Sequence, residues 1–409
     1  MELLGIIVLI IFGVYFSIKL KFKHLNIIKA LKVITRKEDG ISSFSSLCIS
    51  LASRIGVGSL SGVAISLYTG GIGSIFWMWI ITLICSSNTM IESMLSIKYR
   101  IKKNNYYEGG PFYYMDKGLN NKKLSTVYTI IFLVAYFGAF LLIQSNTISK
   151  IVTEIIPINP IIIGIIIVIL TSLIIFKGIK EIASVVSKLI PFIAILYIST
   201  CLIIIFKNIT LIDNIFLLII KEAFNLKSFF VGFVVGCTKS IFSTEAGLGT
   251  GAIACASTSN ADEIEQGLVQ VFGIFFDTFV VSTLTAFVIL LSPKIGFDIN
   301  NLNGIEITRY AFIYNLGKYG GLILTISIIL FAFSTIIGGY YYGEVALKYI
   351  TKKDNTIILK IITIILLLVS TIISPNSIWK LIDIFIVVLA IINTISLILL
   401  SKKDINDKI

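Results

Sequence analysis

The feature that most constrains this chain is a membrane-length apolar segment, residues 43–64, interrupted near its middle by Ile55-Gly56-Val57-Gly58-Ser59. Two glycines and a serine weaken a helix at a depth where lipid offers no hydrogen-bond partners, so an unwound backbone needs protein groups or a water-filled cavity around it. The positive end of a half-helix then suits an anion, and freed carbonyls suit a cation. The alternative interpretation is a close contact between helices through small residues.

The composition places the chain in a lipid bilayer. Of its 409 residues, 56% are hydrophobic and 14% are charged, whereas a soluble protein carries roughly 25% charged residues. The apolar segments mostly reach about 20 residues, which predicts spanning helices rather than a barrel. Five cysteines lie in apolar segments without paired spacing, so neither disulfides nor a metal site is expected. The single histidine, His24, lies in a lysine-rich loop and is expected to be solvated.

Eleven spanning segments are predicted. They are residues 3–19, 43–67, 72–98, 125–150, 158–177, 182–206, 228–258, 265–291, 319–348, 355–374 and 376–400. Of the 34 Lys and Arg residues, 24 fall on one side of these segments, 8 on the other and 2 inside spans. Positive charge is retained in the cytoplasm. We therefore expect an inner-membrane protein of a prokaryote, with its N-terminus outside and its C-terminus in the cytoplasm.

A repeat relates the two halves of the chain. Residues 43–206 and 228–400 each hold five predicted spans, and the second half also opens with a long apolar segment interrupted in its middle, Gly247-Leu248-Gly249-Thr250. Because five is odd, the halves have opposite topology, and paired interrupted helices in inverted halves point to the central site of a transporter. The remaining parts are an extra helix with a basic cytoplasmic loop, an extracellular loop and a cytoplasmic tail, at 1–42, 207–227 and 401–409 respectively.

Several motifs resemble those of a known family. They are GGIGSIFWMW at 70–79, Glu92, Lys98-Tyr99-Arg100, GGPFYY at 109–114, FSTEAG at 242–247, Phe276-Asp277-Thr278 and YYYGE at 340–344. Through them nearly the whole chain resembles the alanine/glycine:cation symporters, also called sodium:alanine symporters. The resemblance implies an all-α membrane protein with the leucine-transporter fold, a five-plus-five inverted repeat with one extra N-terminal helix. It also implies import of small neutral amino acids with sodium.

The predicted substrate site surrounds the two interruptions, because exposed amides suit the carboxylate of an amino acid. Its candidate residues are Gly56, Val57, Gly58, Ser59, Gln144, Ser243, Thr244, Gly247, Thr335 and Gly339. By resemblance, the carbonyls of Ala52 and Ile55 would face Ser334 and Thr335 and bind sodium. The alternative is that these two hydroxyls bond only to their own helix. Gln144 and Asn146 either line the substrate path or hydrogen-bond across helices.

Four charged residues inside apolar segments are candidates for coupling or gating. They are Arg54, Lys239, Glu245 and Asp277. A central charge costs at least ~2.5–3.5 kcal/mol on insertion scales, so partners are expected, and Lys239 is a possible partner of Glu245 or Asp277. Glu245 either stabilises the start of the following helix, which we favour, or contacts an ion or substrate.

The chain departs from the family pattern at four places. Val57-Gly58-Ser59 stands where members have Thr-Gly-Asn, Arg54 replaces a small or hydroxyl residue, Thr244 replaces Asn, and Gly339 replaces a tryptophan that would close the pocket. Arg54 would repel sodium or stand in for it as a tethered charge, and Gly339 would enlarge the pocket.

The sequence thus predicts a transporter of small neutral amino acids that works by alternating access, with sodium as the coupling ion and no cofactor or nucleic-acid partner. One alternative is a proton-coupled or uncoupled exchanger in which Arg54 replaces the ion. Another is a membrane sensor that kept the fold and lost transport. No nucleophile–base pair, metal cluster or phosphate loop indicates an enzyme.

Overall fold

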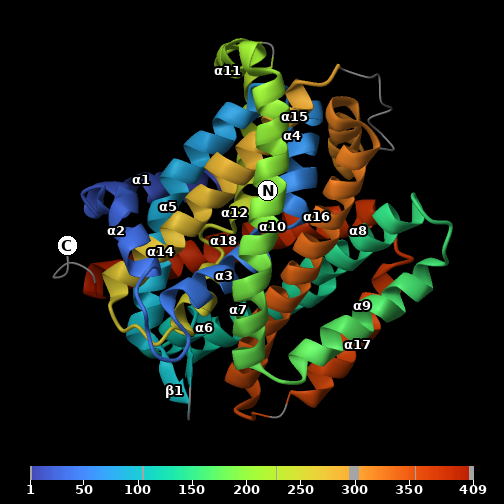
Figure 1. The fold of residues 1–409 in the computed structure, drawn as a ribbon. Coiled ribbons are helices and arrows are strands. Elements are labelled where there is room, and N and C mark those ends of the chain that lie inside the picture. Colours follow the sequence, from blue (N-terminus) through green and yellow to red (C-terminus); the bar gives the residue numbers. More distant parts are fainter. Residues whose placement is uncertain (1, 104–105, 227, 294–303, 355, 405–409) are drawn as a thin grey trace.

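The computed structural model describes residues 2–103, 106–226, 228–293, 304–354 and 356–404, and nearly all of them are helical (Figure 1). In the first half the helices are α1 (Glu2–Lys19), η1 (Lys23–Leu25), α2 (Ile27–Ile34), α3 (Ser43–Arg54), η2 (Gly58–Gly62), α4 (Val63–Thr69), α5 (Ser74–Tyr99), α6 (Pro111–Tyr113), η3 (Tyr114–Gly118), α7 (Lys122–Ala135), η4 (Tyr136–Phe140), α8 (Leu141–Thr153), α9 (Pro160–Ile175), α10 (Ile179–Lys207) and α11 (Ile209–Ala223). In the second half they are α12 (Phe229–Thr244), α13 (Thr250–Ala256), α14 (Glu263–Phe275), η5 (Phe276–Ser282), α15 (Thr283–Leu290), α16 (Gly304–Thr351), α17 (Ile357–Ser370) and α18 (Pro375–Asp404).

Each predicted span contains a helix in the structure. Within the described residues, six helices are long and apolar enough to cross a membrane, and the bent pair α3 and α4 makes a seventh. Four further apolar helices of 10–17 residues, within α1, α9, α12 and α17, occupy other predicted spans. The count of eleven therefore stays a prediction, as do the boundaries of the two halves.

Long helices are continued across short irregular turns. The pairs α7–α8 and α14–α15 are joined by the π-helical segments η4 and η5, and α16 contains a kink at Gly317, which has φ 66°. A π turn is a bulge with one extra residue, a feature frequent at functional sites. The predicted span at 319–348 is therefore the part of α16 after its kink.

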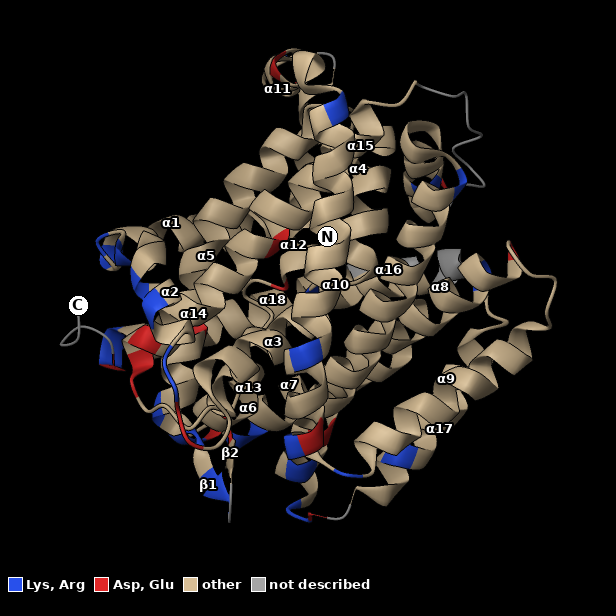
Figure 2. Cartoon of the chain, viewed as in Figure 1, with Lys and Arg blue, Asp and Glu red and all other residues tan. Residues whose placement is uncertain are grey.

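The charges are arranged as the loop count predicts. Figure 2 shows few charged residues in the middle of the bundle and a concentration of Lys and Arg at the end that carries the strands β1 (Ile101–Lys103) and β2 (Tyr106–Glu108). The two strands pair antiparallel, Lys102 opposite Tyr107. Which end faces the cytoplasm stays a prediction from the charge bias.

Two parts of the predicted loops differ from expectation. The outer loop at 207–227 contains α11, whose Ile215 and Ile219 are buried. The predicted tail at 401–409 begins inside α18, which ends at Asp404, and residues 405–409 lie outside the described part.

The prediction that His24 is solvated is wrong. Its side chain is 1% exposed, because the short helix η1 packs against α5 and α14. Burial lowers the pKa of His24 to about 4. The loop is lysine-rich, but this one side chain points inward.

Small residues mediate close helix contacts in the first half of α12 as well as at the interruptions. A Cβ atom added at Gly236 would lie 2.3 Å from the Ser74 carbonyl oxygen, and one at Gly232 would lie 2.9 Å from the Gly70 carbonyl oxygen. Glycine lets the two backbones approach this closely. This contact fixes α12 against the start of α5 and so positions the second interruption.

Candidate functional site

The first interruption separates α3 from α4, which are bent by 52°. The Gly56 amide donates to the Arg54 carbonyl (3.0 Å), and the Val57 amide donates to Gln144 Oε1 (3.4 Å). In a continuous helix these two amides would bind the carbonyls of Ala52 and Ser53. Both carbonyls therefore lose their helical donors, as expected where a spanning helix unwinds inside protein.

The second interruption separates α12 from α13. Three residues between them have positive φ, Glu245 at 53°, Gly247 at 78° and Gly249 at 81°. Side chains from three other helices bind the freed backbone. Glu92 accepts from the Gly249 amide (3.0 Å), Tyr128 donates to the Leu248 carbonyl (2.5 Å), and Asn393 donates to the Gly247 carbonyl (2.9 Å).

The two interruptions meet at one carboxylate. Asp277, on η5, accepts hydrogen bonds from Ser59 of the first interrupted helix and from Ser243 of the second (2.7 Å). The two serine hydroxyls lie 3.0 Å apart. Gly58 allows this contact, because a Cβ there would lie 2.9 Å from the Phe242 ring. Asp277 is fully buried, so its contacts with Ser59 and Ser243 lie inside the bundle.

A small cavity lies beside this junction. Its empty space, counted as all space not filled by protein atoms and including space open to solvent, is about 200 Å³. It is lined by Ser53, Tyr136, Phe140, Leu141, Glu245, Thr335 and Gly339. Thr335 and Gly339 were predicted at the substrate site, and they do share this cavity. A Cβ at Gly339 would meet only the Tyr136 ring, at 3.7 Å, so a side chain could begin at this position without a clash.

Glu245 lines the cavity, and its carboxylate also interacts with the side chain of Thr250, the first residue of α13. Both of its carboxylate oxygens accept from the Ser53 hydroxyl, at 3.0 and 3.2 Å. The carboxylate that binds an amide at the helix start is Glu92, through Gly249. Both sequence interpretations of Glu245, stabilising the start of α13 or contacting an ion or substrate, are therefore compatible with its position.

Arg54 is buried on the other side of the first interruption. A Cβ at Gly251 would lie 2.3 Å from its Nη2, and one at Gly273 would lie 3.1 Å from its Nη1, so two glycines make room for the guanidinium. Nη1 donates to the Gln270 carbonyl (3.3 Å), and within the described part of the chain Nε and Nη2 have no hydrogen-bond partner.

This guanidinium faces three buried carboxylates. It interacts electrostatically with Glu92, Glu245 and Asp277. Of these, Glu92 Oε1 also has no hydrogen-bond partner among the described residues. Arg54 is thus a cation that acts on both Glu245 and Asp277, the two carboxylates for which the sequence offered Lys239 as a possible partner. A buried charge without compensation is costly, so Arg54 compensates this acidic centre.

Of the predicted sodium ligands, those on α16 lie close to the end of α3. Thr335 Oγ1 would lie 2.5 Å from a Cβ at Gly56, and a Cβ at Gly338 would lie 3.2 Å from the Ser53 amide, so this part of α16 packs on the end of α3. Ser334 and Thr335 donate to the Phe331 carbonyl at 2.8 and 3.0 Å. A donating hydroxyl keeps lone pairs for a cation. Both sequence interpretations of these hydroxyls are therefore compatible with their geometry.

Three other residues considered for the substrate path, Thr244, Gly247 and Asn146, do not line the cavity. Thr244 donates to the Ser240 carbonyl of its own helix (2.8 Å), and Gly247 faces Leu9 and Asn88 rather than the cavity. Asn146 donates to two carbonyls at the end of α17, of Ser370 and Ile373, both at 2.8 Å. Gln144, by contrast, reaches the first interruption.

Two residues that contact the second interruption or line the cavity were not among the predicted site residues. The sequence analysis named Glu92 only as part of a family motif. A single acidic residue in an apolar helix indicates a buried partner, so its role at the interruption could have been predicted. Tyr136 lies between Phe132 and Phe140 in a stack of rings, at centroid distances of 4.4 and 4.8 Å. The spacing of four along 128, 132, 136, 140 and 144 marks one helix face that ends at Gln144.

Two interrupted helices that meet around a buried cavity, inside a bundle of apolar helices, are the architecture of a membrane transporter. The sequence model of the sodium:alanine symporter family matches residues 2–408, so this chain belongs to the sodium:alanine symporter family and is an amino-acid transporter, not an enzyme.

Relatives and a solved structure agree with this assignment. The chain is 35% identical over 409 residues to the probable sodium/glutamine symporter GlnT of Bacillus subtilis, with 97% of this chain and 85% of the relative covered. It is 33% identical over 415 residues to the sodium/alanine symporter AgcS of Methanococcus maripaludis, covering 97% and 91%. The crystal structure of MhsT in complex with L-phenylalanine matches with a TM-score of 0.64 at 15% identity, covering 88% of this chain and 89% of that one. The fold is thus the leucine-transporter fold, as predicted.

Proposed function

We propose that this protein imports a small neutral amino acid by alternating access, driven by sodium. The observation that carries the proposal is the convergence of both interrupted helices on Asp277 beside one cavity of about 200 Å³. Phe140, Leu141 and Gly339 give the cavity a small apolar part for a short side chain. The Glu245 carboxylate in its wall suits the ammonium group of an amino acid.

Sodium coupling is supported by the oxygens near the first interruption. The Ala52 carbonyl has lost its helical donor, and the hydroxyls of Ser334 and Thr335 keep acceptor capacity. A hard cation prefers such neutral oxygens. These residues would release sodium when α3 and α16 separate toward the cytoplasm. Release of the ion would then be coupled to the change between the outward-open and inward-open states.

The experiment is uptake into proteoliposomes of labelled L-alanine, glycine and L-glutamine, with an inward gradient of sodium or of choline. We expect sodium-stimulated uptake of at least one of them. Thr335→Val keeps the shape of the side chain and removes its hydroxyl, so the sodium concentration for half-maximal uptake should rise about tenfold, the equivalent of ~1.4 kcal/mol. Thr351→Val, which removes an exposed hydroxyl from the same helix, is the control.

The outcomes separate the alternatives. Uptake that ignores sodium overturns sodium coupling. Binding of an amino acid without any uptake overturns transport and favours a sensor.

A second candidate function is a proton-coupled or uncoupled exchanger in which Arg54 takes the place of the ion. It is favoured by one observation, the guanidinium that faces Glu92, Glu245 and Asp277 inside the bundle. A tethered charge cannot leave with the substrate, so such a protein would exchange amino acids without a sodium gradient. Exchange of labelled for unlabelled substrate at equal sodium on both sides, unchanged when choline replaces sodium, distinguishes it from the first.

A further inference from the structure

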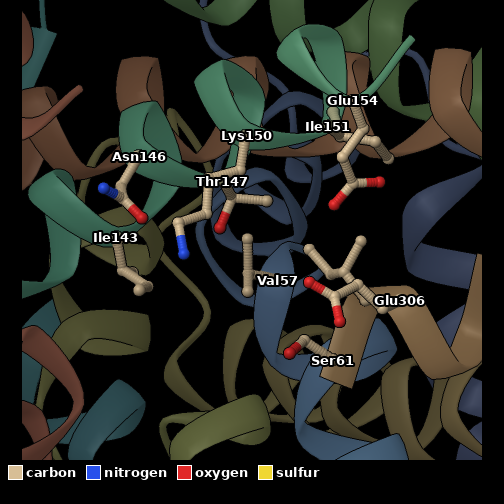
Figure 3. A pocket seen from close by; sticks show the side chains of 10 residues that line it. Val57, Ser61, Ile143, Asn146, Thr147, Lys150, Ile151, Glu154 and Glu306 are labelled. Atoms are coloured by element: carbon tan, nitrogen blue, oxygen red, sulfur yellow. The ribbon is translucent and has the colours of Figure 1, made fainter. Parts of the chain in front are cut away.

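The segment from the end of α1 through α2 is strongly basic. Residues 19–37 contain seven cations and no Asp or Glu: Lys19, Lys21, Lys23, Lys29, Lys32, Arg36 and Lys37. Figure 2 shows blue segments on the turn after α1 and on α2, at the left of the bundle. Lys150 of α8, in contrast, lines a pocket together with Glu154 and Glu306 (Figure 3). The positive charge of residues 19–37 therefore has no acid within its own segment to offset it.

Helix α2 has three different faces. Ala30 and Val33 are buried where α2 packs on α14. The exposed side chains form an apolar and a basic group, Ile27, Ile28 and Leu31 in the first and Lys29 and Lys32 in the second. Because each residue turns the helix by about 100°, the apolar group lies between the buried face and the two lysines. Among the described residues, neither lysine forms an ion pair within 4.0 Å.

The exposed apolar surface of α2 continues one side of α1. The most exposed apolar side chains of α1 are spaced three or four residues apart: Leu4, Ile7, Ile11, Val14 and Ile18. This spacing places them on one face of the helix, which suits contact with lipid. Phe22 and Leu25 are exposed in the turn that follows, and the apolar group of α2 comes next. Acyl chains that lie along this surface would therefore have their headgroup at the lysines of the turn and of α2.

Several contacts hold the basic segment in a fixed position. His24 is buried in the turn, and the Asn26 side chain accepts from the Lys29 amide (3.0 Å) at the start of α2. At the end of the segment, Arg36 pairs with Glu265 of α14 (2.8 Å). The lysines are therefore presented by a packed structure, which can bind a ligand without first being ordered.

Two lysines from different helices meet beside the turn. Lys19 Nζ donates to the Ser401 carbonyl near the end of α18 (2.5 Å), and Lys19 and Lys402 repel each other electrostatically. An anion beside two like charges offsets their repulsion. A phosphate at this place would be attracted by cations of both α1 and α18.

We propose that the turn after α1 and helix α2 form a binding site for an anionic phospholipid. The apolar face of α2 contacts the acyl chains, and the headgroup phosphate is bound by Lys19, Lys21, Lys29 and Lys32. Helices with lysines beside an apolar face bind anionic bilayers in this way. Because α2 packs on α14, which leads into η5 and Asp277, the bound lipid stabilises the folded protein. The site concerns the membrane and does not depend on which substrate is transported.

The pattern of side chains selects this class of ligand. A soluble phosphate would use the lysines and leave the apolar side chains of the turn and of α2 in water. A lipid without net charge would cover the apolar side chains and leave the lysines uncompensated. An anionic phospholipid matches both groups at once.

The test measures binding of labelled dioleoylphosphatidylglycerol to the immobilised full-length protein in a neutral detergent, with dioleoylphosphatidylcholine in parallel. The wild type should bind phosphatidylglycerol at least tenfold more tightly. Each lysine near an anionic lipid surface contributes about a fivefold change in affinity. The triple variant Lys21→Gln, Lys29→Gln and Lys32→Gln should therefore bind phosphatidylglycerol about a hundredfold more weakly and phosphatidylcholine within twofold of the wild type. Ile28→Ser with Leu31→Ser should weaken the binding of both lipids.

The matched control is a second triple variant, Lys117→Gln, Lys122→Gln and Lys123→Gln. It removes three exposed lysines from the same end of the bundle, where Lys403 contacts Gly118. Without added lipid, both triple variants should unfold at the wild-type temperature, because all six lysines are exposed. Phosphatidylglycerol should raise the unfolding temperature of the wild type and of the control, but not that of the first triple variant.

Three outcomes would overturn the site. The first is equal affinity of the wild type for the two lipids, or an unchanged affinity for phosphatidylglycerol in the first triple variant. The second is an equal loss of affinity in both triple variants, which indicates a general attraction of this end of the protein to anionic lipid. The third is competition by glycerol 1-phosphate at the concentrations at which phosphatidylglycerol competes, which indicates a site for soluble phosphate.

Discussion

Replacing Arg54 by threonine should make the stability of this protein depend on sodium. The guanidinium is 2% exposed and faces Glu92, Glu245 and Asp277, so its removal leaves buried carboxylates without their cation. Among the described residues Arg54 forms no ion pair within 4.0 Å, but it compensates these carboxylates electrostatically, and a buried ion without compensation costs several kcal/mol. We therefore expect Arg54→Thr in choline chloride to lose several kcal/mol of its free energy of unfolding.

Sodium should restore part of this loss. Gly251 and Gly273 flank the guanidinium, so its removal opens a space between α13 and α14 beside carboxylates that attract a cation. A ligand that binds only the folded state at 100 times its Kd stabilises it by ~2.7 kcal/mol. The assay is thermal unfolding in detergent, in sodium chloride and in choline chloride at equal ionic strength, followed by uptake in proteoliposomes.

The control is Arg309→Thr, which removes a part-exposed partner of Glu154. Pairs of this kind contribute about 0–1 kcal/mol, so this variant should unfold close to the wild type in both salts. If Arg54→Thr loses the same stability in both salts, or none in either, the idea that Arg54 occupies the role of an ion is refuted.

Three further predictions concern other parts of the molecule. Glu92→Gln removes the charged acceptor of the Gly249 amide, so uptake should fall at least tenfold, as expected for a loss of ~1.5–3 kcal/mol at the second interruption; unchanged uptake would show that this contact is dispensable. Gly339→Trp fills the cavity beside Tyr136, so competition assays should show a larger loss of L-glutamine than of glycine, and an equal loss of both would contradict the placement of Gly339 in the substrate pocket. Burial lowers the pKa of His24 to about 4, whereas unfolding returns it to about 6.5, so the unfolded state binds more protons between these values. Stability should therefore fall as the pH drops from about 6.5 to about 4, and the unfolding temperature of His24→Gln should vary less with pH; identical pH profiles would rule out this histidine as the cause.

The spans and the interruptions were predictable because they depend on local sequence. A run of apolar residues gives a helix, and Gly56 and Gly58 or Gly247 and Gly249 weaken it, whatever packs around it. The helix α11 was missed because its 15 residues read as a loop between two much longer apolar segments.

The partners of the interruptions were not predictable in the same way. Asp277 meets Ser59 across 218 positions of the chain, and Glu92 meets Gly249 across 157. Nothing local tells which buried acid faces which broken helix, so the contact of Glu92 with the Gly249 amide was not predicted. The direction of Arg54, toward Gly251 and Gly273, likewise depends on packing between segments far apart in the sequence.

The π-helical segment that carries Asp277 has a consequence for how the chain tolerates change. Each residue of an α-helix advances the rotation by about 100°, so the extra residue in Phe276–Ser282 sets the angular position of everything in α15 relative to α14. Deleting one residue after Asp277 would rotate Thr285, which is bonded to Tyr197 of α10, away from its partner while leaving the composition almost untouched. The number of residues in this segment, more than the identity of any single side chain, therefore sets the rotation of α15 relative to α14.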